Sequence, residues 1–258
     1  MNIERMKKNE LVSYCKEIGI DHNQNKKELI NSANQYVIKE ISQSIKEGTD
    51  FELLKYKINA LANNYASNLK LKIKDRKKEM ESDDNSHYLI YRVLGISVEE
   101  GKLIDEYQNT GRFLYKYAGS FLEEAASICL FFANPSGSKT TVENTLGTRP
   151  KRFEIDFLNN NDAVEIKWRD ATTDGDHITK EHTRVNVIKN HGYKPIRVMF
   201  YYPQRTQAKR IQETLKTLYK GIDGEYYAGD EAWDYIQKTT KYDLKAILEE
   251  IATRRDHE

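Results

Sequence analysis

The sequence predicts an α/β fold, in which a central mixed sheet is flanked by helices and preceded by a small N-terminal helical module. Two segments with strand-like alternation, 153–158 and 163–168, are joined by the turn-forming run 159–162 and predict a β-hairpin. A long helical pattern over 111–132 precedes the hairpin, and a buried-type strand over 195–202 follows it between further helical patterns. Helices and strands that alternate in this way are typical of α/β domains.

Three segments are predicted along the chain. Residues 1–40 form two short helices, the first ended by Gly19 and the second beginning near Lys26. A SAP-like helix-extended-helix module, which touches the DNA backbone, and a plain helical hairpin both fit this pattern. Residues 41–86 are a helical connector, and residues 87–258 form the main domain.

A basic run lies within the connector. Six of the nine residues from Lys70 to Lys78 are basic, and only Asp75 opposes them. Such a run either grips phosphate or is a solvated helix face, and the second reading is favoured.

Composition excludes several classes of protein. The 41 basic and 40 acidic residues give a net charge of +1, which argues against a histone-like protein that coats DNA. Cys15 and Cys129 form no CxxC pair, so neither a disulfide framework nor a cysteine zinc cluster is expected. The longest apolar stretch, 125–133, is too short to span a membrane, and no signal peptide is visible. We therefore expect a cytoplasmic protein; no Walker A loop is found, so no nucleotide cofactor is expected.

The predicted hairpin carries the residues best suited to catalysis. Strand alternation puts Glu165 and Lys167 on one face, and the hairpin returns Asp156 opposite Glu165. We expect two carboxylates and one ammonium to converge on one spot, with Glu154 as a further carboxylate on the face of Asp156. Carboxylates gathered in this way repel one another until a hard cation binds, so Mg²⁺ is expected and Mn²⁺ can substitute for it. The alternative is a surface hairpin with a cross-strand ion pair.

The same residues resemble a known motif. Asp156, followed after eight residues by Glu165-Ile166-Lys167, resembles the PD-(D/E)XK nuclease motif, although Ile155 stands where the motif has proline. The stretch 148–177 is similar to the ApaLI-like restriction endonucleases, and the resemblance covers the last two thirds of the chain.

The resemblance implies a type II restriction endonuclease that hydrolyses double-stranded DNA at a short palindrome, with Mg²⁺, as a homodimer. It implies a restriction-endonuclease-like core over 87–258 and one more metal ligand, Glu123 or Glu124, on the helix before the hairpin. Polar side chains that flank the hairpin are expected to contact DNA: Lys139, Arg149, Lys151, Arg152, Arg169, Thr172, Thr173, Lys180 and Arg184. Two alternatives stay open: a junction-resolving or repair nuclease of the same fold, and a non-catalytic DNA-binding protein.

Overall fold

The computed structural model of the chain describes residues 3, 6–169 and 175–257. The chain forms two compact units. The first comprises Met1–Asn59 and Glu123–Glu258, and the second, which we call the arm, comprises Ala60–Leu122. Two long helices, α3 (Asp50–Glu81) and α5 (Val98–Ala133), contribute residues to both units.

The N-terminal helices form as predicted. α1 (Lys8–Glu17) ends just before Gly19, whose φ of +72° suits glycine. α2 (Lys26–Glu47) begins at Asn25, whose side chain accepts a hydrogen bond from the backbone N–H of Glu28 at 3.0 Å. Apolar side chains of the two helices share one small core: Leu11, Cys15, Leu29 and Ala33. Contact of this module with DNA stays a prediction.

A mixed five-stranded sheet lies at the centre of the first unit, which confirms the predicted fold class. Its order is β1-β2-β3-β4-β5, with antiparallel pairing from β1 to β3 and parallel pairing from β3 to β5. The strands are β1 (Ser138–Glu143), β2 (Arg152–Asn159), β3 (Asp162–Arg169), β4 (Lys194–Tyr201) and β5 (Glu225–Ala228). The predicted hairpin is β2–β3, and Asn160 takes the positive φ of +49° at its turn.

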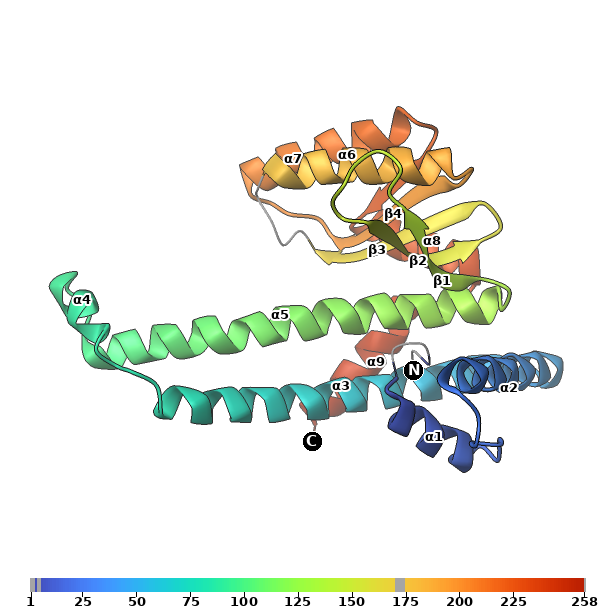
Figure 1. Cartoon of the computed structure of the whole chain (residues 1–258), viewed down its shortest axis with the longest axis horizontal. Coiled ribbons are helices and arrows are strands. Elements are labelled where there is room, and N and C mark those ends of the chain that lie inside the picture. Colours follow the sequence, from blue (N-terminus) through green and yellow to red (C-terminus); the bar gives the residue numbers. More distant parts are fainter. Residues whose placement is uncertain (1–2, 4–5, 170–174, 258) are drawn as a thin grey trace. The chain divides into compact units, whose positions relative to one another are not determined.

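Helices cover both faces of this sheet (Figure 1). α6 (Gly175–Asn190) and α7 (Thr206–Lys220) pack on one face, where Val185, Met199 and Leu215 share a core. The C-terminal end of α5 and α8 (Asp230–Thr240) lie on the other face, where Trp233 packs on Phe200 at 4.3 Å between ring centroids. α9 (Leu244–Asp256) joins the start of α3 through an ion pair of 2.8 Å between Lys55 and Glu250.

One strand departs from the sequence prediction. Residues 138–143, for which the sequence predicted no strand, form the edge strand β1. Val142 is the only buried side chain of this described strand, so its sequence shows almost no apolar alternation. Backbone hydrogen bonds to β2 make this segment a strand, although the pattern of its side chains does not predict one.

The pairing of β1 with β2 contains a bulge. Ser138 pairs with Leu158 and Thr140 with Ile155, so two steps along β1 span three along β2. The extra residue reverses the alternation within β2. Ile155 and Leu158 both pack toward the α6 side as a result, although they are an odd number of residues apart.

The arm consists of parts of α3 and α5 with the short helix α4 (Tyr88–Val93) between them. α4 is fastened to α5 by Asp105, which accepts a hydrogen bond from Tyr91 Oη at 3.0 Å and lies 2.9 Å from His87 Nε2. Among the helices that the structure describes, none has an apolar stretch long enough to cross a membrane.

Candidate active site

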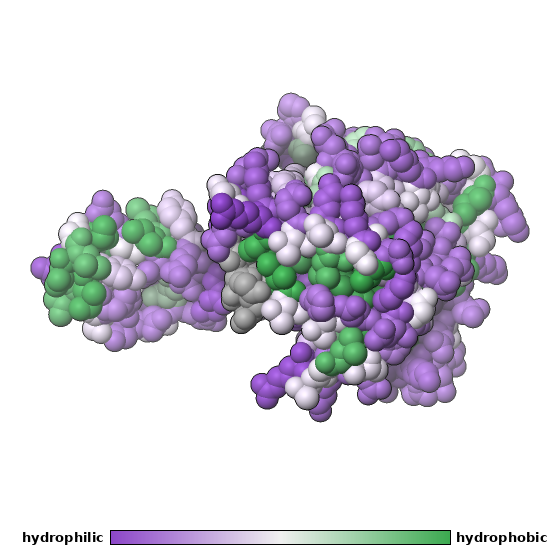
Figure 2. All heavy atoms as spheres, turned by 90° about the horizontal axis from the view of Figure 1, so that it is seen from above, coloured by the Kyte–Doolittle hydropathy of each residue, from purple (hydrophilic) through white to green (hydrophobic). Residues whose placement is uncertain are grey.

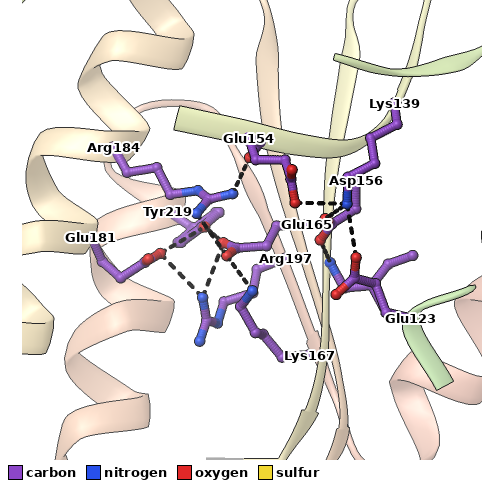
Figure 3. A network of polar contacts seen from close by, with 11 residues as sticks. Glu123, Lys139, Glu154, Asp156, Glu165, Lys167, Glu181, Arg184, Arg197 and Tyr219 are labelled. Atoms are coloured by element: carbon purple, nitrogen blue, oxygen red, sulfur yellow. Dashed lines mark hydrogen bonds and ion pairs between the residues drawn. The ribbon is translucent and has the colours of Figure 1, made fainter. Parts of the chain in front are cut away.

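Three carboxylates surround one ammonium group on the α5 face of the sheet. Lys139 Nζ lies 2.8 Å from Glu123 Oε1, 2.7 Å from Glu154 Oε1 and 3.0 Å from Asp156 Oδ1. Oxygen atoms of the three acids lie within 4.8 Å of one another. We call Glu123, Glu154, Asp156 and Lys139 the carboxylate cluster (Figure 3).

Three elements bring these side chains together. Glu123 comes from α5, Lys139 from β1, and Glu154 and Asp156 from β2. Asp156 is only 4% exposed, and its second oxygen, Oδ2, accepts a hydrogen bond of 2.9 Å from the backbone N–H of Ile166. This contact fixes the Asp156 carboxylate against the strand that carries the rest of the motif.

The other two motif residues lie in a different group. Glu165 is 3% exposed, and its Oε1 lies 2.7 Å from Lys167 Nζ and 2.9 Å from Arg184 Nη1. Its Oε2 lies 3.1 Å from Arg197 Nη1 and accepts a hydrogen bond from Tyr219 Oη at 3.3 Å.

Glu181 completes this group. Its Oε2 lies 3.1 Å from Arg197 Nη1 and 3.3 Å from the hydroxyl of Tyr219. We call the group of Glu165, Lys167, Glu181, Arg184, Arg197 and Tyr219 the arginine cluster. Glu165 and Arg197 are neighbours in the parallel register of β3 and β4, so their side chains share one face of the sheet. Glu181 of α6 and Tyr219 of α7 contact them there, so the arginine cluster lies on the α6 and α7 face.

The charges of the arginine cluster control the pKa of Glu165. Burial raises that pKa, but the positive charges of Arg184, Lys167 and Arg197 lower it by a larger amount. The pKa of Glu165 therefore lies well below its usual range. Burial lowers the pKa of Arg197, while Glu165 and Glu181 raise it by more. Glu165 and Arg197 are thus each held in the charged form by neighbours of opposite charge.

Lys139 follows the same logic in the carboxylate cluster. Burial lowers the pKa of its ammonium, but Asp156, Glu123 and Glu154 together raise it above the usual range. The side chain is 15% exposed, so this cation is held inside the structure rather than in solvent.

Glu165 and Lys167 meet as expected, with 2.7 Å between Oε1 and Nζ, whereas Asp156 contacts Lys139 in the carboxylate cluster instead. The bulge in β2 turns Asp156 toward α5, while Glu165 on the neighbouring strand faces α6 and α7. Alternation alone puts opposite residues of a hairpin on one face, and a single extra residue breaks that rule.

The two clusters carry opposite formal charges. Three carboxylates and one ammonium give the carboxylate cluster a formal charge of −2. Two carboxylates, two guanidinium groups and one ammonium give the arginine cluster a formal charge of +1. The first attracts a cation, whereas the second attracts an anion.

The structure brings Glu123 and Glu154 to Asp156, and among the described residues Glu124 and Glu165 are not part of that carboxylate group. Glu181, Arg197 and Tyr219 had no place in the sequence-based site. Their signal is weak, because each lies far from the motif in sequence and is buried only by the tertiary fold.

The predicted DNA contacts fall into three sets. Lys139 and Arg184 are engaged inside the two clusters, and Arg184 also donates to the backbone carbonyl of Glu154. Thr172 and Thr173 lie outside the described residues. The remaining five side chains are exposed: Arg149, Lys151, Arg152, Arg169 and Lys180.

An antiparallel hairpin in a mixed five-stranded sheet, covered by helices on both faces and lined with acidic residues, is the architecture of restriction-endonuclease-like proteins. The ApaLI-like restriction endonuclease family matches residues 17–253, so the chain belongs to this family. It is a restriction endonuclease, which hydrolyses double-stranded DNA. No curated protein and no solved structure matches the chain.

Proposed function

We propose that the chain is a type II restriction endonuclease that cleaves both strands of a short palindrome and requires Mg²⁺. The observation that supports metal dependence is the carboxylate cluster. Its three carboxylates are hard oxygen donors, which are the ligands that Mg²⁺ and Mn²⁺ prefer. Its formal charge of −2 is the charge that one divalent cation neutralises.

The ammonium of Lys139 supports the same proposal. It is a cation supplied by the chain itself, and it lies within 3.0 Å of all three acids. Oxygen atoms that are arranged closely around an ammonium group also suit a metal cation. Asp156 and Glu123, together with Glu154, would hold the metal.

A bound Mg²⁺ would polarise the scissile phosphate and lower the pKa of a water molecule. Beside a metal held by these carboxylates, Lys139 would supply a further positive charge for the phosphate. Asp156 also fixes β3 through the Ile166 N–H, so the two strands keep their spacing at the site.

Glu165 and Lys167 have a different task in this proposal. The Lys167 side chain is 35% exposed, and its ammonium is oriented by Glu165 at 2.7 Å. Lys167 offers its charge to the phosphate as the reaction proceeds, and Glu165 is a positioning residue. The excess positive charge of the arginine cluster favours a phosphate over a second metal ion.

The DNA contacts and the homodimer complete the proposal. The exposed cations Arg149, Lys151, Arg152, Arg169 and Lys180 are proposed to contact phosphates and bases near the hairpin. A palindromic site has two-fold symmetry, so two copies of the chain would each cut one strand.

Two substitutions test the assignment of the metal site. Asp156→Asn and Glu123→Gln should weaken Mn²⁺ binding in calorimetry by at least about tenfold, because each removes one charged ligand. Asp156→Asn should also lower single-turnover cleavage of plasmid DNA by several orders of magnitude, with DNA affinity nearly unchanged.

Glu165→Gln is the matched control, because it should leave Mn²⁺ binding intact. If Glu165→Gln abolishes Mn²⁺ binding while Glu123→Gln does not, the metal belongs to the motif residues instead. Full cleavage in excess chelator would overturn metal dependence, and cutting confined to branched DNA would overturn the type II assignment.

A further inference from the structure

The arm lacks an apolar core of its own. Of the arm's residues, all of which the structure describes, only five are buried: Leu61, Ala62 and Leu122 at its two ends, and Tyr88 and Gly101 between them. Two helices that bury so little gain only a small stabilisation from their own packing. A partner that covers part of the arm would supply the missing burial.

Apolar side chains gather at the end of the arm that carries α4 (Figure 2). Val93 and Leu94 are 74% and 72% exposed, which is rare for aliphatic side chains. The tip patch consists of seven side chains that are at least half exposed: Leu89, Ile90, Val93, Leu94, Leu103, Ile104 and Tyr107. Seven such side chains expose several hundred Å², on the scale of the ~800 Å² that each partner buries in a standard interface.

The tip patch is held rigidly. Asp105 binds both Tyr91 and His87, and the rings of Tyr88 and Tyr91 close over Gly101. A Cβ atom at Gly101 would lie 2.7 Å from the Tyr91 ring, so the helices are in close contact there. The patch is therefore preformed, and a partner would not need to order it first.

Charge divides the arm into two parts. The tip, from Met80 to Tyr107, is acidic, with Glu81, Asp83, Asp84, Glu99, Glu100, Asp105 and Glu106 against Arg92 and Lys102. The shaft, from Asn63 to Glu79 and from Gln108 to Phe121, is basic, with Lys70, Lys72, Lys74, Arg76, Lys77, Lys78, Arg112 and Lys116 against Asp75 and Glu79. An acidic apolar tip does not suit nucleic acid or an anionic membrane.

We infer that the arm is the dimerisation element of the enzyme and that its partner is the arm of a second copy of this chain. A two-fold axis across the arms runs them antiparallel, so each acidic tip meets the basic shaft of the other copy. The shaft also exposes the apolar side chains Leu71, Leu114 and Tyr115, which can receive the tip patch. The basic run of α3 thereby gains a protein partner. The inference deepens the proposed homodimer and rests on it.

Analytical ultracentrifugation of the full chain, without DNA or metal, tests this inference. The parent should sediment as a dimer. Val93→Gln with Leu94→Gln should raise the dissociation constant by at least about tenfold, since it removes the two most exposed apolar side chains of the patch. Ile45→Gln is the control: it also replaces an exposed apolar side chain by Gln, but on α2, outside the arm. It should leave the dimer intact. An unchanged far-ultraviolet circular dichroism spectrum shows that each variant keeps its helices.

A charge reversal tests the antiparallel arrangement. Glu81→Lys with Glu99→Lys reduces the net charge of the tip from −5 to −1, and Lys72→Glu with Lys74→Glu reduces that of the shaft from +6 to +2; all four residues are exposed. Each variant alone should dimerise more weakly than the parent, because the attraction between tip and shaft is reduced. A mixture of the two should favour heterodimers, because the unchanged tip of one copy then meets the unchanged shaft of the other.

A monomeric parent, a Gln variant that dimerises like the parent, or a mixture without a preference for heterodimers would each overturn the inference. Metal-dependent cleavage is measured separately on the same preparations. If the chain does not dimerise through the arm but still cleaves DNA, only the arm inference is wrong. If the chain dimerises through the arm but does not cleave DNA at all, only the proposed nuclease function is wrong.

Discussion

At the scale of single residues, Lys139 balances part of the negative charge of the carboxylate cluster. Three buried or half-buried carboxylates would repel one another, and the ammonium at 2.7–3.0 Å from each of them relieves that repulsion. The same ammonium stands where a divalent cation would be attracted most. In the proposed metal site, Lys139 would therefore compete with the cation.

Lys139→Met should raise the affinity for Mn²⁺, because it removes the competing charge and keeps most of the side-chain volume. An effect of about tenfold or more is expected, since unit charges ~4 Å apart interact by about 4 kcal/mol at an effective dielectric constant of ~20. Calorimetric titration with Mn²⁺ in the absence of DNA measures it, with the exposed Lys151→Met as the control. An unchanged or weaker affinity would show that Lys139 does not compete with the cation.

Glu165 belongs to the residue scale as well, because it joins two arginines and one lysine inside the fold. Glu165→Gln should lower the free energy of unfolding at pH 7 by about 3 kcal/mol, since breaking a buried ionic network leaves charges uncompensated. The pKa of Glu165 is depressed in the folded state, so its contribution is complete above its unfolded pKa of about 4.5. It is lost as pH falls further, by about 1.4 kcal/mol per pH unit.

Urea unfolding at pH 7 and about pH 3.5 measures this difference between parent and variant. The gap in unfolding free energy should narrow at the lower pH. Glu249→Gln, on the exposed side of α9, should show a small effect at both pH values. A Glu165→Gln penalty that does not change with pH would contradict the ionic origin of the stabilisation.

At the scale of elements, the bulge in β2 separates the two clusters. It turns Asp156 and Phe157 away from the α6 face, and Phe157 then packs directly on Gly137 just before β1. A Cβ at Gly137 would lie 2.3 Å from Phe157 Cζ, so no larger residue fits without a shift. The position of Asp156 thus depends on a glycine at the end of a neighbouring element.

Gly137→Ala should lower the free energy of unfolding by about 1–3 kcal/mol, because the added methyl group overpacks Phe157. It should also weaken Mn²⁺ binding, since a shift of Phe157 moves Asp156. Gly111→Ala is the opposite control: it has open space around it in α5, so it should raise stability by up to about 1 kcal/mol. Urea unfolding and calorimetry of both variants are the measurements, and equal behaviour of the two would refute the packing argument.

At the scale of the whole molecule, a palindrome demands two active sites in register. The carboxylate cluster lies entirely in the first unit, whereas the tip patch lies entirely in the arm. The two proposals thus assign metal binding and association to different parts of the chain. A change in the carboxylate cluster should leave association intact.

Mixed dimers of parent and Asp156→Asn should nick their site rather than cut it, because only one subunit of each pair is active. Co-expression with two affinity tags gives the mixed dimer, and gel analysis of supercoiled plasmid separates nicked from linear product. Nicked plasmid should be the main product. If linear product dominates at the parental ratio, one subunit cuts both strands and the proposed symmetric mechanism is wrong.

The sequence by itself determined the fold class and the identity of most acidic candidates. Alternation and the turn at 159–162 predict the β2–β3 hairpin, and helical periodicity with stop signals predicts α1, α2, α6 and α7, because these are local properties of the chain. The motif pointed to Asp156 and the ApaLI-like family, and the family match confirms the second point.

Only the tertiary structure decided which residues meet. β1 was not predicted from the sequence, since an edge strand with one buried residue has no periodic signal. Lys139 was expected to contact DNA, and only the fold placed it among three carboxylates. The one-residue bulge in β2 turned the Asp156 side chain to the opposite face of the sheet. A bulge exists only relative to the neighbouring strand, so the alternation within β2 alone cannot predict it. Arg197 and Tyr219 reached Glu165 from 32 and 54 residues away, because burial selects partners by space rather than by sequence.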